Sequence, residues 1–326
     1  MAEALIIDAV RTPRGKRKGS LAGIHAVDLA AHVLNAALER TGAPPEKVED
    51  VVLGCVTQIG EQAFDVARGA VLAAGLPISV PGKTVNRLCG SGLTAVADVA
   101  SGILAGQIQL GIGGGVESMT RIPMGSDAGF GDGPTSPRLG ERFPDLTHQG
   151  LSAELIARKW SLSRGQLDEF ATASQSKAIA ARGAGWFRLE IAPVPVPDAG
   201  GGTRLFAEDE HPRPGTTVET LAALKPSFRE ATTTAAAPST MPEALPAWMT
   251  PSSRKLGLSA ASVSTVVPGR GARPLRRVGC RRQHPGRGPG RSPGGTSRPR
   301  GPRWPCPARR WRTRRAARGR ATTSGR

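Results

Sequence analysis

The chain has 326 residues, enough for one large domain or two medium ones, so length alone leaves many folds open. Its 42 glycines, 28 prolines and net charge of +18 are unusual for an ordinary globular enzyme. Residues 268–326 contain 19 arginines and no lysine, aspartate or glutamate, which leaves residues 1–267 at −1, so no polyanionic partner is indicated for the main part of the chain.

Residues 4–116 alternate predicted strands with predicted helices. Apolar runs predict strands at 4–10, 48–56, 83–88 and 109–116. Apolar residues at helical spacing predict helices at 27–41, 64–74 and 92–105, and Gly42 and Gly75 close the first two. This alternation over about a hundred residues predicts an α/β fold with a mostly parallel sheet.

From residue 120 the sequence becomes rich in Gly, Pro and polar residues, and helices follow after residue 145. Ser163 and Gln166 form the pattern of a capping box, which predicts a helix that runs through Ala181. An extended segment is expected at 191–196. Beyond Pro268 no window has enough apolar residues to offset chain entropy, so we expect a disordered tail.

Four cysteines, Cys55, Cys89, Cys280 and Cys306, are too few and too scattered for a disulfide framework. None pairs at a metal-ligand spacing, so no metal is expected. The N-terminus lacks the basic and apolar regions of a secretory signal, and no apolar stretch approaches the roughly 18 residues of a membrane helix. We therefore expect a cytoplasmic protein without membrane contact.

Cys89 lies in the run V-N-R-L-C-G-S-G-L at residues 85–93, between a predicted strand and a predicted helix. The positive end of a helix dipole lowers a thiol pKa and favours the nucleophilic thiolate. Gly90 and Gly92 allow backbone or ligand to approach closely. The spacing alone fits two interpretations, an activated nucleophile or a small buried apolar residue. For Cys55, inside an apolar run, the second is favoured.

The run at 85–93 closely resembles the nucleophile motif of thiolases, enzymes that condense or cleave acyl-CoA thioesters. Other segments are similar to that family in the same order: A-V-R-T-P at 9–13, G-C-V-T-Q at 54–58, G-G-G-V-E-S-M-T-R at 113–121 and Q-L-D-E-F at 166–170. The resemblance extends over about 230 residues. It implies the layered αβαβα fold of thiolases, with an N-terminal half and a loop domain that covers coenzyme A.

The resemblance also implies roles for five residues. Cys89 stands where the family has the cysteine that accepts the acyl group. His148 stands near the position of a histidine beside the pantetheine arm, and Arg213, Thr220 and Ser239 fall at loop-domain positions along coenzyme A. Solvated loop residues remain the alternative for His148 and Arg213. The implied reaction needs no cofactor besides coenzyme A thioesters as substrates, and the implied partner is another copy of the chain.

By the same resemblance the chain divides into four parts. Residues 1–120 form the N-terminal α/β core, 121–230 the loop domain, 231–267 a degraded continuation of the core, and 268–326 the Arg/Pro/Gly-rich tail. The family's catalytic histidine in a G-H-P motif and its second cysteine in a C-x-G motif have no counterpart in the right context. His284 precedes Pro-Gly in the tail without a neighbouring apolar strand, and Cys280 and Cys306 lack the C-x-G pattern.

Several functions therefore stay open. A thiolase by descent, with little turnover, is the leading prediction. A ketoacyl synthase of the same fold fits less well because residues 121–228 are similar to the thiolase loop domain. A non-catalytic remnant is a third possibility, and the fourth is weak nucleic-acid binding by the tail, whose two tryptophans are too few for base stacking.

The abrupt change of composition motivates a hypothesis about the tail, namely a shifted reading frame after codon 267. A shift of the coding DNA by one or two bases should then restore the G-H-P and C-x-G motifs, and their absence from both frames would reject the idea.

Overall fold

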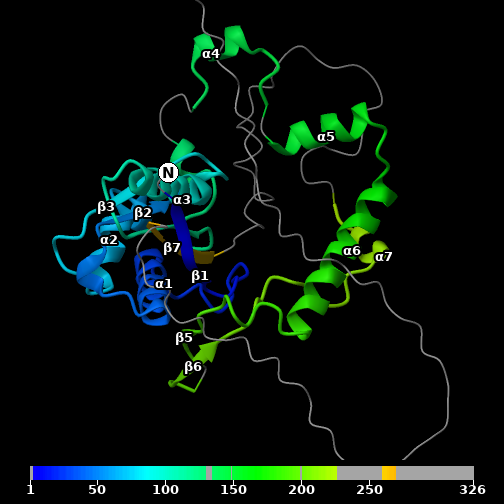
Figure 1. The fold of residues 1–326 in the computed structure, drawn as a ribbon. Helices are drawn as coiled ribbons and strands as arrows, with labels where there is room; N and C mark the ends of the chain where they lie inside the picture. Colours follow the sequence, from blue (N-terminus) through cyan, green and yellow to red (C-terminus); the bar gives the residue numbers. More distant parts are fainter. Residues whose placement is uncertain (1–2, 130–133, 148, 199, 226–258, 269–326) are drawn as a thin grey trace, which may run out of the picture. The chain divides into compact units, whose positions relative to one another are not determined.

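A computed structural model describes residues 3–129, 134–147, 149–198, 200–225 and 259–268 (Figure 1). Its centre is a five-stranded sheet in the order β1-β7-β4-β2-β3. The strands are β1 (Ala4–Arg11), β2 (Asp50–Gly54), β3 (Gly82–Val85), β4 (Gly111–Ser118) and β7 (Ser259–Pro268).

Strand direction decides which side chains meet at one edge of this sheet. β2 pairs in parallel with β3 and with β4, whereas β7 is antiparallel to both β1 and β4. The strands β1 to β4 therefore all run the same way, and their carboxyl ends lie along one edge. In open α/β sheets that edge is where ligands usually bind.

Both faces of the sheet are covered by helices, which explains the continuous apolar run of β2. Val51 and Leu53 pack in one buried cluster with residues of α1 (Ala26–Thr41) and α2 (Val66–Ala73). Val52, which points to the opposite face, packs with Ala95 and Val99 of α3 (Ser91–Leu104).

Glycine lets α3 approach β4 closely. A Cβ atom on Gly113 would lie 2.7 Å from the Cα of Val96, a separation that real Cβ atoms essentially never show. The triple glycine of β4 is thus a packing surface for the small-residue helix. α3 also exposes apolar side chains to solvent, and Leu93 is 77% exposed.

The described residues after β4 include the helices α4 (Pro137–Arg142), α5 (Gln149–Lys159), α6 (Arg164–Gly183) and α7 (Val218–Ala222). The capping box of Ser163 and Gln166 is present at the start of α6, as predicted. β5 (Val194–Pro197) and β6 (Thr203–Phe206) form an antiparallel pair, and Val194, Val196 and Phe206 join the buried cluster of α1 and α2. Short 3₁₀ turns occur at Pro45–Lys47, Gly60–Gln62 and Ser126–Ala128.

The α/β class is confirmed, and the predicted strands and helices of residues 4–116 are all present, with ends that differ from the predicted ones by up to three residues; the strand predicted at 109–116, for example, covers Gly111–Ser118. The strand predicted at 83–88 ends at Val85 because hydrogen bonds fold the next residues into a turn. The strand predicted at 48–56 covers only Asp50–Gly54. The helix predicted from residue 64 begins at Val66 because the Asp65 carboxylate caps it by accepting from the N–H of Arg68.

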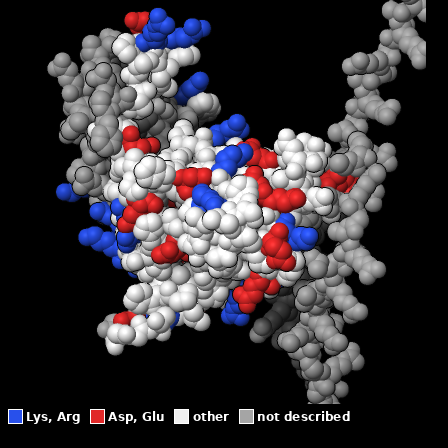
Figure 2. All heavy atoms as spheres, turned by 90° about the vertical axis from the view of Figure 1, so that its left-hand side faces the viewer, with Lys and Arg blue, Asp and Glu red and all other residues white. Residues whose placement is uncertain are grey.

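The four-part division of the chain remains a prediction. Residues 226–258 and 269–326, which hold Ser239 and nearly all of the Arg-rich tail, lie outside the described residues, and so does His148. On the face shown in Figure 2, acidic and basic side chains are interspersed, in line with the near-neutral charge of residues 1–267. Within the described ranges no helix is long and apolar enough to cross a membrane.

Candidate active site

Cys89 lies in the short turn that joins β3 to α3, at the sheet edge where the parallel strands end. Its side chain is exposed. The preceding residue, Leu88, has a φ of 48°, in the left-handed region that non-glycine residues rarely adopt. This turn therefore presents the sulfur to solvent from a constrained backbone.

Ser91 holds the turn from within. Its hydroxyl accepts a hydrogen bond from the N–H of Arg87 at 2.8 Å and donates one to the carbonyl oxygen of Leu88 at 2.6 Å. The N–H of Ser91 also donates to the Leu88 carbonyl, at 3.0 Å. The buried Ser91 therefore fixes the two residues that precede the exposed Cys89.

The start of α3 lies directly against the end of β2. A Cβ atom on Gly54 would be 2.5 Å from the carbonyl carbon of Ser91 and 2.6 Å from the nitrogen of Gly92. Only glycine at position 54 leaves room for the first turn of α3 at this place. The contact places Cys89 at the amino-terminal end of a 14-residue helix, whose first N–H groups point towards this turn.

Cys55 differs from Cys89 in every respect that matters for nucleophilic chemistry. Its side chain is only 1% exposed, as expected for a small apolar core residue. Burial, with a further contribution from the negative charge of Glu117, raises the pKa of the Cys55 thiol to about 12. Cys55 is therefore a protonated core residue, and of the two cysteines in the described ranges only Cys89 is exposed.

A second polar cluster at the same sheet edge was not apparent from the sequence. The Glu117 carboxylate at the end of β4 accepts hydrogen bonds from the N–H of Val56 and from the side chain of Gln62, both at 2.8 Å. Gln62 is fully buried. A glutamate inside the run G-G-G-V-E-S-M-T-R gives no sequence signal of its own for these contacts.

Two of the predicted coenzyme A residues are described, on the segment next to α7. Arg213 is exposed, and its backbone N–H donates to the side chain of Gln175 on α6 at 2.9 Å. The Thr220 hydroxyl accepts from the N–H of Thr217 at 2.9 Å and the Thr220 N–H donates to the Thr217 hydroxyl at 3.2 Å, which forms a capping box; the Thr220 hydroxyl also donates to the Thr217 carbonyl oxygen at 2.9 Å. The Thr220 hydroxyl thus forms its hydrogen bonds with Thr217, whereas the charged side chain of Arg213 is exposed to solvent.

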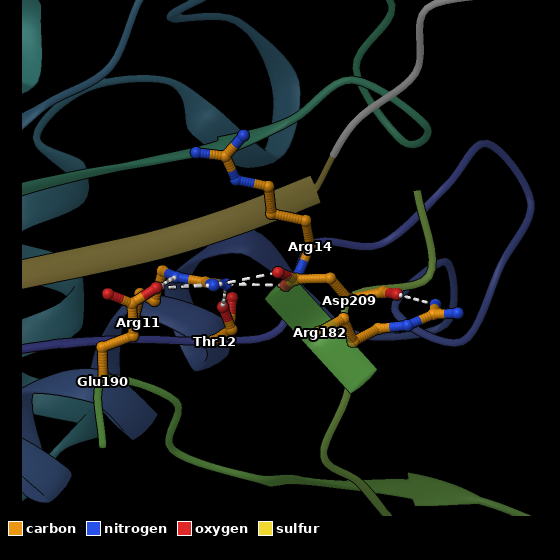
Figure 3. A network of polar contacts seen from close by, with 6 residues as sticks. All are labelled: Arg11, Thr12, Arg14, Arg182, Glu190 and Asp209. Atoms are coloured by element: carbon orange, nitrogen blue, oxygen red, sulfur yellow. Dashed lines mark hydrogen bonds and ion pairs between the residues drawn. The ribbon is translucent and has the colours of Figure 1, made fainter. Parts of the chain in front are cut away.

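The carboxyl end of β1 carries an ion-pair network that joins distant segments (Figure 3). Two nitrogens of the Arg11 guanidinium contact the two carboxylate oxygens of Asp209 at 2.6 and 2.9 Å, and the third contacts Glu190 at 2.8 Å. The N–H of Arg14 donates to Asp209 at 2.8 Å, and Arg182 of α6 donates to the Asp209 carbonyl oxygen at 2.8 Å.

The electrostatics of this network follow from its geometry. Burial alone would raise the pKa of Asp209, but the hydrogen bonds from Arg11 and from the Arg14 N–H outweigh it and hold that pKa below its ordinary value. The carboxylate therefore stays charged and holds residue 209 at the end of β1, while Glu190 contacts Arg11 and Arg182 contacts the Asp209 carbonyl oxygen.

Comparisons with known proteins identify the family of this chain. The family model described as "Thiolase, N-terminal domain" matches residues 4–242. The beta-ketoadipyl-CoA thiolase of Pseudomonas aeruginosa is 42% identical over 307 residues, which cover 86% of this chain and 76% of that protein. The 3-ketoacyl-CoA thiolase of Pectobacterium carotovorum is 39% identical over 294 residues, 89% of this chain and 73% of that protein.

A solved structure is similar as well. The crystal structure of the acetyl-CoA acetyltransferase of Bacillus anthracis superposes with a TM-score of 0.64 at 28% sequence identity. The match covers 82% of this chain and 66% of that one, so about a third of that structure has no counterpart in the superposition.

Proposed function

This chain belongs to the thiolase family, and from that premise we propose that Cys89 accepts an acyl group from a coenzyme A thioester. The observation that carries the proposal is the exposed Cys89 sulfur on a constrained turn at the start of α3. The Cys89 thiolate attacks the thioester carbonyl carbon, a new carbon–sulfur bond forms, and the bond to the coenzyme A sulfur breaks. Coenzyme A leaves as a thiolate and takes up a proton.

The second half of the reaction passes the acyl group on. In the forming direction the acceptor is the α-carbon of a second thioester, which loses a proton to a base, bonds to the acyl carbon and releases the Cys89 thiolate. In the breaking direction Cys89 instead attacks the 3-keto carbonyl of a 3-ketoacyl-CoA, the bond from that carbon to the α-carbon breaks, acetyl-CoA leaves after protonation of its α-carbon, and the thiol of another coenzyme A then takes the acyl group from Cys89. Both steps need a base, and a thiol at its ordinary pKa is only a few per cent thiolate at neutral pH. A paired base contributes about 10²–10⁴ in rate.

The sequence lacks the family's G-H-P histidine and C-x-G cysteine in their usual contexts. We therefore propose that this chain performs the first half-reaction slowly and sustains little turnover. Acyl transfer to Cys89 should then be observed without complete turnover, so the two are measured in separate assays.

Coenzyme A recognition is proposed for four residues, Arg213, Thr220, His148 and Ser239. The exposed charge of Arg213 supports a contact with a phosphate of the nucleotide end. The Thr220 hydroxyl already donates to the Thr217 carbonyl oxygen, so it contributes to coenzyme A binding only as a hydrogen-bond acceptor. We expect Arg213→Ala to raise the acetyl-CoA concentration for half-maximal acylation by about threefold to tenfold, the effect of one lost charge-assisted hydrogen bond at an exposed site.

The test incubates the purified chain with acetyl-CoA and follows each cysteine peptide by mass spectrometry. We expect a time-dependent acetyl adduct on the Cys89 peptide, lost in Cys89→Ala and kept in Cys55→Ala. Acetylation of the peptides that contain Cys280 and Cys306 measures the non-specific reaction of cysteines with acetyl-CoA. A folded chain whose Cys89 is acetylated no faster than that background would reject the proposal and favour a non-catalytic remnant.

The tail supports a second candidate function. Nineteen arginines without an acidic residue in 268–326 favour contact with phosphate groups. We expect weak binding to duplex DNA that falls steeply with salt and is equal for unrelated sequences. Fluorescence anisotropy with two labelled duplexes at several salt concentrations measures it, and a strong preference for one duplex would contradict the assignment.

We also propose that the chain self-associates, as the family resemblance implies. Light scattering of the purified chain measures its molar mass directly, and a mass of 33.8 kDa at micromolar concentration would contradict self-association.

A further inference from the structure

The turn that carries Cys89 is connected to the interior of the sheet by a continuous series of hydrogen bonds. We propose that Asn86 and Glu117 are positioning residues that hold the Cys89 turn in the shape that places its sulfur at the start of α3. The proposal rests on the proposed role of Cys89 as acyl acceptor, and it assigns to the two residues no contact with substrate.

The interior end of the series is the Glu117 carboxylate. One oxygen accepts from the N–H of Val56 at 2.8 Å, and the other accepts from the Gln62 side chain at 2.8 Å and from the N–H of Thr57 at 3.4 Å. Gln62 in turn accepts from the N–H of Ser118 at 2.7 Å and donates to the Thr57 carbonyl oxygen at 2.9 Å. A carboxylate that accepts from two successive backbone N–H groups fixes the turn after β2 rigidly.

The outer end of the series is the Asn86 side chain. Its amide nitrogen donates to the carbonyl oxygen of Val56 at 3.0 Å, and its amide oxygen accepts from the N–H of Leu88 at 2.9 Å. The peptide of Val56 is thus held by Glu117 at its nitrogen and in turn holds Asn86 through its carbonyl. Asn86 thereby fixes the backbone of Leu88, the residue that directly precedes Cys89.

Leu88 shows why the turn needs such an anchor. Its left-handed backbone, at φ 48°, is unfavourable for a residue with a side chain and persists only where the surroundings impose it. Packing does not impose it, because the Leu88 side chain is 68% exposed. Hydrogen bonds therefore carry the constraint, and they come from Asn86 on one side and Ser91 on the other.

The expected consequence of a lost anchor is a changed position of Cys89 relative to α3. If Leu88 relaxes to an ordinary backbone conformation, the peptide between Leu88 and Cys89 rotates and the sulfur moves from the helix end. Interactions with a helix N-terminus change an equilibrium by about twofold to fivefold, so the rate at which Cys89 reacts with an electrophile should fall by a similar factor.

The experiment measures the rate at which iodoacetamide alkylates Cys89 between pH 5 and 10. Mass spectrometry of the Cys89 peptide excludes the other three cysteines from the signal. Asn86→Ala and Glu117→Gln are compared with Asn35→Ala and Glu39→Gln, two exposed positions on α1 that serve as matched controls. We expect both site variants to give a pH profile that differs from that of the parent chain and to slow alkylation at pH 7 by about twofold to fivefold, and both controls to match the parent chain.

The pH profile distinguishes positioning from a general role in stability, because lost stability lowers the unfolding midpoint without a change in the Cys89 profile of the folded chain. Thermal unfolding followed by circular dichroism identifies the folded variants. Asn86→Ala decides alone if Glu117→Gln does not fold, since the Asn86 side chain is exposed. A parent-like profile for Asn86→Ala overturns the proposal.

Alkylation requires no coenzyme A thioester, so its result is independent of the acetylation test. A shifted profile in a chain that acetyl-CoA does not acylate would support the positioning role while the proposed function fails. An unshifted profile in a chain that is acylated would support the proposed function and reject the positioning role.

Discussion

Replacement of Gly54 by alanine tests the close contact between β2 and the start of α3. The added Cβ would lie 2.5, 2.6 and 2.7 Å from the Ser91 carbonyl carbon, the Gly92 nitrogen and the Ser91 Cβ. Two of these atoms belong to the backbone, so no side-chain rotation relieves the overlap. The first turn of α3 must retreat by about 1 Å to restore ordinary contact distances, and overpacking of this kind costs about 2–3 kcal/mol.

Urea unfolding of the parent chain and of Gly54→Ala measures this cost as a difference in the free energy of unfolding. Gly23→Ala is the matched control, because a Cβ on Gly23 meets no atom within 4 Å, and its effect should stay within about 1 kcal/mol. Alkylation of Cys89 in the folded Gly54→Ala chain should slow as well, since the helix end has moved. Equal stability of Gly54→Ala and Gly23→Ala would refute the reasoning.

Two further predictions concern other groups at the same sheet edge. Asp209→Asn leaves the Arg11 guanidinium without its main partner and should lower the free energy of unfolding by about 2–3 kcal/mol at pH 7. Because the folded pKa of Asp209 is depressed, this contribution is complete above about pH 5 and shrinks as the pH falls below the ordinary pKa of about 4, so the difference between parent and variant should narrow on acidification in urea titrations. Cys55, with a pKa raised to about 12, should resist iodoacetamide at pH 8 in the folded chain and react after denaturation; rapid native-state labelling of its peptide would contradict the assignment.

Local patterns in the sequence were sufficient to predict the elements of the first 118 residues. The alternation of apolar runs with helical spacing identified four strands and three helices, because each pattern reflects burial on one or two faces. The errors fall at element ends. Val85 and Leu88 continue an apolar run, yet the side chains of Asn86 and Ser91 supply alternative hydrogen bonds and fold the backbone into a turn.

Long-range partners could not be predicted in the same way. Arg11 and Asp209 are 198 residues apart, and no periodicity connects them. The role of Glu117 depends on the N–H groups of Val56 and Thr57, which become neighbours of β4 only when β2 pairs with it. The resemblance to thiolases singled out Cys89 through its motif, whereas the residues that hold its turn needed three-dimensional contacts to be found.

The place of β7 has a consequence for how the chain folds during synthesis. β7 lies between β1 and β4 and pairs with both along their length, from Ala4 with Pro268 and from Ser118 with Ser259. The first strand to leave the ribosome therefore finds its neighbour only after more than 250 further residues have been joined. Closure of so long a loop is entropically costly and slow, and until then β1 and β4 each expose an unpaired edge to other nascent chains. Chaperone dependence during translation should accordingly last until residue 268 has emerged.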